Sequence, residues 1–192
     1  MGSLVLTGDT SGSGTINVPA VAGTFTATIG SATGTHYPFT AGTAVASTSG
    51  TSIDFTSIPS WVKRITVMLN GVSTNGTSIP QVQIGSGSVT TTGYSAIGMG
   101  SSGSSGGIGS FTAGFGVADG SVASNALNGH IVLTLQSGTT WVASGIVMRS
   151  TNGIGFIAGV SPSLGGALDR VRITTVNGTD TFDAGSINIL YE

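Results

Sequence analysis

Residues that build the solvent-facing side of a helix are almost missing from this chain. Lysine occurs once, at Lys63, and charged residues make up only 6% of the sequence, against about 25% in ordinary soluble domains. Amphipathic helices need Glu, Lys, Arg and Gln on their polar side. Gly, Ser and Thr fill this chain instead, between short runs rich in Val, Ile and Thr. This composition is typical of short β-strands.

The strand pattern predicts an all-β fold. Three short strand-like pieces lie within residues 1–29, and about ten more follow between residues 51 and 192. In the segment 62–70, Ile65, Val67 and Leu69 alternate with polar residues, as in a strand with one face exposed to water. Many short strands separated by turn residues favour an antiparallel β-sandwich or jelly roll.

The strands suggest two parts, 1–49 and 50–192. The three N-terminal pieces carry too few apolar side chains to be stable alone, so we expect them to pack on other parts of the protein or on another chain. Residues 30–50 have the composition of a linker, with an aromatic group at 37–39. We predict an N-terminal attachment or trimerisation segment over residues 1–49 and a sandwich head over 50–192.

One stretch, residues 98–111, contains six glycines and five serines and no charge. Its composition favours a flexible exposed loop. A bare backbone on a surface can also meet a ligand or a neighbouring subunit. The candidate contact residues are Gly100, Ser101, Ser102, Gly103, Ser104, Ser105, Gly106 and Gly107.

Five of the twelve charged residues gather between positions 169 and 183. Asn177-Gly178 is a strong signal for a two-residue hairpin turn. That turn places Arg172 opposite Asp183, so the cluster becomes a cross-strand ion pair. Phe182 and Ile187 have opposite parity along the strand. Both can be buried only if a bulge intervenes, which we place at Gly185.

The chain offers little for catalysis or metal binding. His36 and His130 lie far apart, and Asp54 and Asp119 are the carboxylates left without a structural role. No nucleophile elbow or phosphate-binding motif is present, and the chain has no cysteine. The acidic residues lack the spacing of a calcium loop. We therefore expect no enzyme activity, no catalytic residues, no metal site and no cofactor.

Charge and hydropathy limit the partners. The formal net charge of −2 disfavours nucleic acid, which attracts clustered Lys and Arg. Every apolar run is interrupted within a few residues, which disfavours insertion into a membrane.

Two parts of the sequence resemble proteins of tailed bacteriophages. Residues 47–78, STSGTSIDFTSIPSWVKRITVMLNGVSTNGTS, and 168–192, LDRVRITTVNGTDTFDAGSINILYE, resemble a module of tail and tail-fibre proteins. Residues 4–35, with the pattern LTGDTSG…VPAVAGT…ATGT, resemble a β-rich element that precedes fibre domains. The sequence departs from that pattern at TATIG, where the element has an apolar strand, and it contains no coiled-coil or collagen-like shaft.

The resemblance implies a non-enzymatic virion protein, made in the bacterial cytoplasm and assembled as a homotrimer. It favours a short tail-fibre or receptor-binding protein that meets other virion proteins through residues 1–49 and faces a glycan or protein of the host surface. A capsid decoration protein, of the cement or head-fibre kind, is the alternative. A glycan-active tailspike ranks third.

Overall fold

The computed structural model of the chain describes residues 4–7, 13–16, 39–102, 105–117, 123, 125–150 and 153–192. The chain divides into two compact units, Met1–His36 and Tyr37–Glu192. In the smaller unit, β1 (Leu4–Thr7) pairs antiparallel with β2 (Ser13–Ile16). These are the first two predicted strands. The third, at residues 23–29, lies outside the described residues.

The larger unit contains a nine-stranded antiparallel sheet. Its strand order is β10-β9-β14-β13-β12-β6-β16-β3, and β4 also pairs with β16. The strands are β3 (Thr40–Ala41), β4 (Val45–Ala46), β6 (Arg64–Thr74), β9 (Ser95–Ser102), β10 (Ser105–Phe111), β12 (Leu127–Ser137), β13 (Thr140–Arg149), β14 (Gly153–Val160) and β16 (Phe182–Tyr191). All of their pairings are antiparallel.

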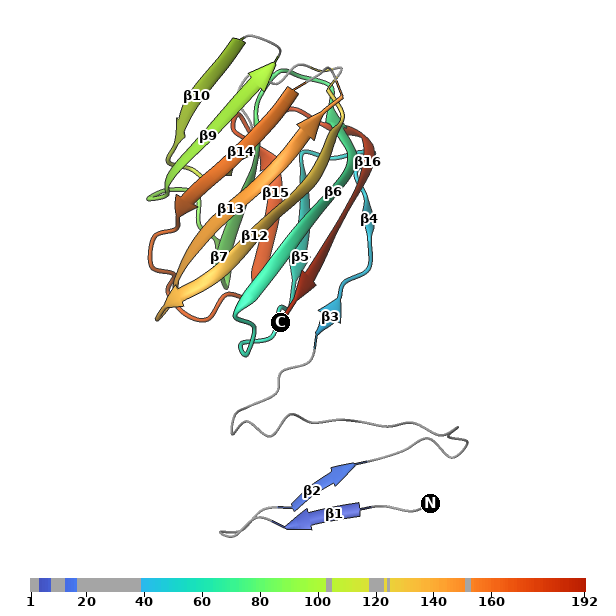
Figure 1. Cartoon of the computed structure of the whole chain (residues 1–192), viewed down its shortest axis with the longest axis vertical. Helices are drawn as coiled ribbons and strands as arrows, with labels where there is room; N and C mark the ends of the chain where they lie inside the picture. The colour runs from blue at the N-terminus through green and yellow to red at the C-terminus, as the bar shows by residue number, and fades with distance from the viewer. Residues whose placement is uncertain are drawn as a thin grey trace. The chain divides into compact units, whose positions relative to one another are not determined.

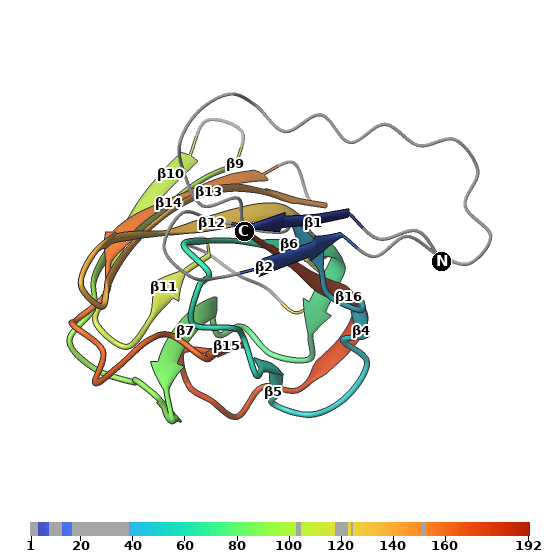
Figure 2. The ribbon, with the colours of Figure 1, turned by 90° about the horizontal axis from the view of Figure 1, so that it is seen from below.

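A smaller, five-stranded sheet covers part of the large one. Its order is β11-β7-β15-β5, with β8 paired to β7. The strands are β5 (Ser52–Thr56), β7 (Pro80–Ser86), β8 (Ser88–Val89), β11 (Phe115–Gly116) and β15 (Arg170–Thr175). Figure 1 looks onto the large sheet with the strands of the small sheet behind it, and Figure 2 shows the two sheets as separate layers.

The core lies between these two layers. Ile65, Val67 and Leu69 of β6 are buried, as their alternation predicts. Trp141 of β13 and Phe115 of β11 are among the largest fully buried side chains. The all-β antiparallel sandwich predicted from the sequence is therefore confirmed. The described residues contain no helix long and apolar enough to cross a membrane.

The boundary of the head differs from the prediction. The larger unit begins at Tyr37, and β3 and β4 pair with β16 of the large sheet. The backbone N–H of Ser47 donates to the carbonyl of Gly185 (2.9 Å), and that of Phe182 donates to Gly50 (2.8 Å). Residues 39–50 therefore belong to the sandwich, because they satisfy backbone groups along the outer edge of β16. The predicted boundary at residue 50 falls inside this unit.

The predicted C-terminal hairpin is wrong. Strand β15 pairs with β5 and β7 in the small sheet, whereas β16 pairs with β6 in the large one. Asn177-Gly178 thus turns the chain from one sheet to the other. The N–H of Gly178 donates to the carbonyl of Thr175 (3.0 Å), so the turn closes one residue earlier than a hairpin centred on Asn177-Gly178 requires.

The ladder is irregular at Gly185, as predicted. The pairing of β16 with β6 shifts register twice, between Phe182 and Ala184 and between Ala184 and Ser186, and Gly185 has a φ of +92°. The parity of the buried side chains of β16 changes across this irregular stretch. Phe182, Ile187 and Ile189 are consequently all buried, as predicted.

Candidate functional site

The Gly/Ser stretch is a pair of strands, and its interpretation as a flexible loop is wrong. Gly100, Ser101 and Ser102 end β9, and Ser105, Gly106 and Gly107 begin β10, where Gly107 pairs with Gly100. Gly103 and Ser104 lie outside the described residues. Strand β9 also pairs along its whole length with β14. Backbone hydrogen bonds to two neighbours hold this part of β9 in place despite its lack of side chains.

The strands at this end of the large sheet carry small residues on the inner face and large apolar residues on the outer face. In β9, Gly98 and Gly100 are buried, while Ile97 and Met99 are exposed. A Cβ at Gly98 would lie 2.8 Å from the ring of Phe111, so that ring occupies the space beside the glycine. The interior has no room here for larger side chains, and the apolar ones point outward.

The outward-facing apolar residues form a continuous surface. Ile146 of β13 lies opposite Phe156 of β14, Phe156 opposite Met99 of β9, and Met99 opposite Ile108 of β10. Directly opposed residues share one face of a sheet. We use the name apolar face for the eight exposed large apolar residues of these four strands. They are Ile97, Met99, Ile108, Val142, Ile146, Met148, Ile154 and Phe156.

The apolar face carries no charged side chain. Arg149 is the one charged residue in β9, β10, β13 and β14, and it is buried rather than outward-facing. Beyond β13, a shallow hollow of about 440 Å³ over β6 and β12 is lined by His130 and Arg64, among other residues. Exposed Ser101, Ser110 and Ser144 add only uncharged hydroxyls among the apolar side chains, so the first charged group appears at the border of the apolar face. Large exposed apolar patches with polar rims are typical of protein interaction sites.

A polar cleft of about 310 Å³ lies on the small sheet, lined in part by Arg172, Gln81, Gln83 and Thr174. The register places Arg172 beside Gln83 and Thr174 beside Gln81. Gln83 donates its side-chain amide to the carbonyl of Ala113 (2.8 Å). The volume is at the lower end of the range for small-molecule sites, about 300–1,000 Å³.

One acceptor in this cleft has no donor. Gln81 donates to the carbonyl of Thr175 (3.3 Å), but its Oε1 is buried with no hydrogen bond among the described residues. The Arg172 guanidinium binds Asp54 through two hydrogen bonds, and these raise the pKa of Arg172. The cleft therefore offers amide, hydroxyl and guanidinium groups, which suit a polar ligand.

Two Asn-Gly turns meet at one end of the sandwich. The N–H of Asn75 donates to the carbonyl of Thr181 (2.9 Å), and the N–H of Asn177 donates to Ser78 Oγ (3.0 Å). Asp180 accepts from the Asn177 side chain (2.6 Å) and from the N–H of Ser78 (2.9 Å). The hydrogen bond from Asn177 is the main reason why the pKa of Asp180 lies below its usual range. These turns are structural.

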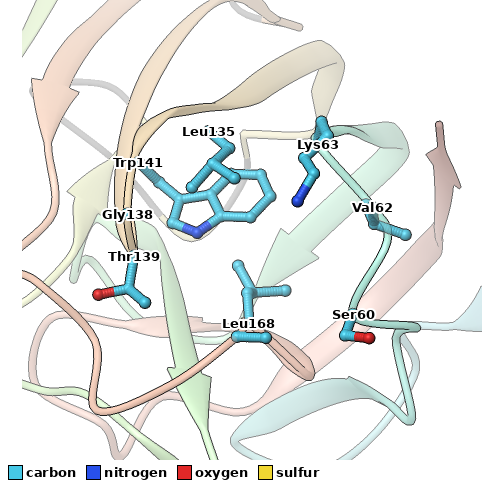
Figure 3. A pocket seen from close by; sticks show the side chains of 9 residues that line it. Ser60, Val62, Lys63, Leu135, Gly138, Thr139, Trp141 and Leu168 are labelled. Atoms are coloured by element: carbon cyan, nitrogen blue, oxygen red, sulfur yellow. The ribbon is translucent and has the colours of Figure 1, made fainter. Parts of the chain in front are cut away.

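A small cavity of about 40 Å³ lies beside Trp141 (Figure 3). Leu135 and Leu168 lie around the indole, and the side chain of Lys63 points toward it. The indole N–H is buried and has no acceptor among the described residues. A polar cavity of this size can hold a water molecule that satisfies this N–H, but it is too small for an organic ligand.

The remaining candidate residues are not brought together. Asp54 pairs with Arg172, and His130 is exposed on β12. Asp183 accepts a hydrogen bond from Ser73 Oγ. His36 and Asp119 lie outside the described residues. No group of three or more metal-ligating side chains occurs in the described parts of the chain.

The sequence signal for the apolar face was the alternation of Ile97, Met99 and Ile108 with glycine, which the abundance of Gly and Ser concealed. The polar cleft had no local signal, because Gln83 and Arg172 meet only through the pairing of β7 with β15.

Comparisons of the chain with family models, with curated proteins and with solved structures found no match.

Proposed function

We propose that this chain is a non-enzymatic structural protein of a bacteriophage virion, of the short tail-fibre or receptor-binding type. The observation that carries the proposal is the apolar face, which is exposed and uncharged in the single chain. Covering that much apolar surface is favourable, so a chain of this kind functions in an assembly. The resemblance of residues 4–35, 47–78 and 168–192 to phage tail modules suggests which assembly this is.

The polar cleft favours the receptor-binding role over the decoration of a capsid shell. Gln81, Gln83 and Arg172 present donors and acceptors on the side of the sandwich opposite the apolar face. A protein with an assembly surface on one sheet and a polar cleft on the other can bind to its own particle and still face a ligand. In this proposal, the smaller unit, Met1–His36, supplies the contact with the neighbouring virion protein, because residues 39–50 belong to the sandwich.

Two measurements test the proposal. Antibodies raised against the purified chain should label the tail of the phage that encodes it, in negatively stained particles. The purified chain should also compete with that phage for adsorption to host cells. Labelling over the capsid shell, without competition, would support the decoration role. Absence of the chain from purified virions would overturn both assignments.

The matched variants for the adsorption assay are Gln83→Ala in the cleft and Ser163→Ala outside it. We expect Gln83→Ala to weaken competition and Ser163→Ala to leave it unchanged. Ser163 is a suitable control because it is exposed, its hydroxyl forms a hydrogen bond with that of Thr140 (3.0 Å), and it does not line the cleft. Equal competition by both variants would remove the cleft from the proposal.

A further inference from the structure

We propose that the apolar face is the surface through which copies of this chain contact one another. The inference goes beyond the virion assignment, because it stands on the surface alone. It names both the residues in contact and the partner, which is the same face of another copy. The argument rests on residue placement, on the free edge, on charge and on area.

The placement of glycine and apolar residues shows which face is made for burial. A glycine on the inner face of a strand adds no side chain to the core. In β14, Gly153 and Gly155 face inward, while Ile154 and Phe156 face outward. A Cβ at Gly153 would lie 2.5 Å from Arg149 Nε, so the inner face has no room there for a larger side chain. The outward side chains contribute to stability only if another surface covers them.

The apolar face also reaches a free edge of the large sheet. Strand β10 is the last strand in the order, and its sequence, SGGIGSF, has no charge and no proline. Sheet edges that remain in water usually carry charged residues or proline, which prevent pairing with other chains. Ile108, at the middle of β10, is 70% exposed. An unprotected edge beside an apolar surface is expected where a partner covers both.

The absence of charge points to another copy of the chain as this partner. When two copies meet through the same face, both partners bring the same groups, so a face with charges of one sign repels its own copy. The apolar face has no charged side chain, so contact between copies carries no such penalty. A partner recognised by charge complementarity would find nothing to bind.

The area is sufficient. The eight side chains are exposed by 38–70%, which corresponds to roughly 600–800 Å² if each can expose about 150–200 Å². A standard interface buries about 800 Å² on each partner, and the largest apolar patch of an ordinary monomer is about 300–600 Å².

The test is the mass of the intact chain by sedimentation velocity across the micromolar range. The wild-type chain should sediment as an oligomer of the 18.8 kDa chain. Phe156→Lys and Met99→Lys should each weaken self-association roughly 30-fold or more, as expected for central residues of an interface. Val176→Lys is the matched control, because Val176 is also exposed, at 47%, but lies on a turn outside the apolar face.

A mixing experiment separates loss of contact from loss of folding. Met99→Lys and Met99→Glu copies should each be impaired alone and should associate when mixed, because the two partners then bring opposite charges to the interface. Phe156→Ser, a milder change, replaces Phe156→Lys if the lysine variant unfolds. A monomeric wild-type chain at about 100 µM, a concentration well above typical dissociation constants, would overturn the proposal. Equal association of the wild type, the face variants and the control would do the same.

Discussion

Arg172 and Asp54 face each other across strands β15 and β5, and their side chains are joined by two hydrogen bonds of 2.7 and 3.0 Å. Both side chains are more than a third exposed. This ion pair links β5, an edge strand of the small sheet, to its neighbour β15. Asp183, the partner predicted from the sequence, lies in the other sheet.

A double-mutant cycle tests this pairing. Replacement of Arg172 by Met should lower the free energy of unfolding by at most about 1 kcal/mol, because exposed ion pairs are screened by water and salt. Its effect should couple to that of Asp54→Asn, by about 0.2–1 kcal/mol, and not to that of Asp183→Asn. Urea unfolding of the single and double variants measures the coupling. Coupling of Arg172 to Asp183 would contradict this pairing and support the hairpin predicted from the sequence.

Gly185 should be among the least replaceable residues of the head. A Cβ at this position would lie 2.4 Å from the carbonyl carbon and oxygen of Gly71, and the φ of +92° is unfavourable for any side chain. The matched control is Gly178→Ala, where φ is +69° and no atom lies within 4 Å of the added Cβ.

We expect the control to cost about 1–2 kcal/mol from backbone strain alone, and Gly185→Ala to cost at least about 1–3 kcal/mol more because of the clash. Thermal and urea unfolding of the two variants provide the comparison. Similar losses in both would mean that β16 can relax around the bulge.

Tyr94 should ionise only at high pH. Its hydroxyl accepts from the N–H of Ile84 (2.9 Å) and lies within hydrogen-bonding distance of the carbonyl of Thr90 (3.0 Å), and burial raises its pKa to about 12. Because this pKa is above that of the unfolded chain, the contribution of Tyr94 to stability is complete below about pH 10. It is lost as the pH rises through 12.

Ultraviolet titration of tyrosinate should therefore show a tyrosine that ionises late, and the late step should be missing in Tyr94→Phe. That variant should also lose about 1–3 kcal/mol at neutral pH, because the buried N–H of Ile84 loses its acceptor. A titration of all tyrosines near pH 10 would contradict the buried hydroxyl.

Asp180 should make the head sensitive to acid. Hydrogen bonds from Asn177 and Ser78 hold its pKa below the ordinary 3.8. The folded-state pKa is therefore lower than the unfolded one, so the carboxylate stabilises the fold above about pH 4. This contribution is lost as the pH falls through the folded-state pKa. The difference in unfolding free energy between the wild type and Asp180→Asn should shrink from pH 7 to pH 3, and a constant difference would exclude this role.

Alternation was a reliable guide to the strands but an incomplete guide to their faces. In β6, Ile65 and Val67 face the core, as their pattern predicts. In β9, Ile97 and Met99 have the same alternation, but they face outward because Phe111 and the backbone of Gly116 close the inner side. An alternation with a period of two residues identifies the two faces of a strand, but only the packing of the second sheet decides which face is the interior.

The turn signal at Asn177-Gly178 was also an incomplete guide, because it did not show which strands pair. Asn177-Gly178 does turn the chain, but its Asn side chain binds Asp180 and the turn connects two sheets. Which strands pair is decided by contacts far apart in the sequence, such as that of Arg172 with Asp54, and no local motif contains that information. The bulge at Gly185 could be predicted because it depends only on parity within one strand.

The burial of the apolar face in the assembled protein can be measured directly, because the chain has no cysteine. Single-cysteine chains carrying Ile146→Cys or Val176→Cys present comparable thiols, since the two native side chains are 49% and 47% exposed. The rate of thiol alkylation is then measured as the protein concentration rises from nanomolar to about 100 µM, the range over which typical interfaces form. The account predicts that the thiol at position 146 becomes protected as the concentration rises, while the thiol at position 176 reacts at a constant rate. Equal, concentration-independent alkylation of both would show that the apolar face stays open to water, and it would contradict the central claim.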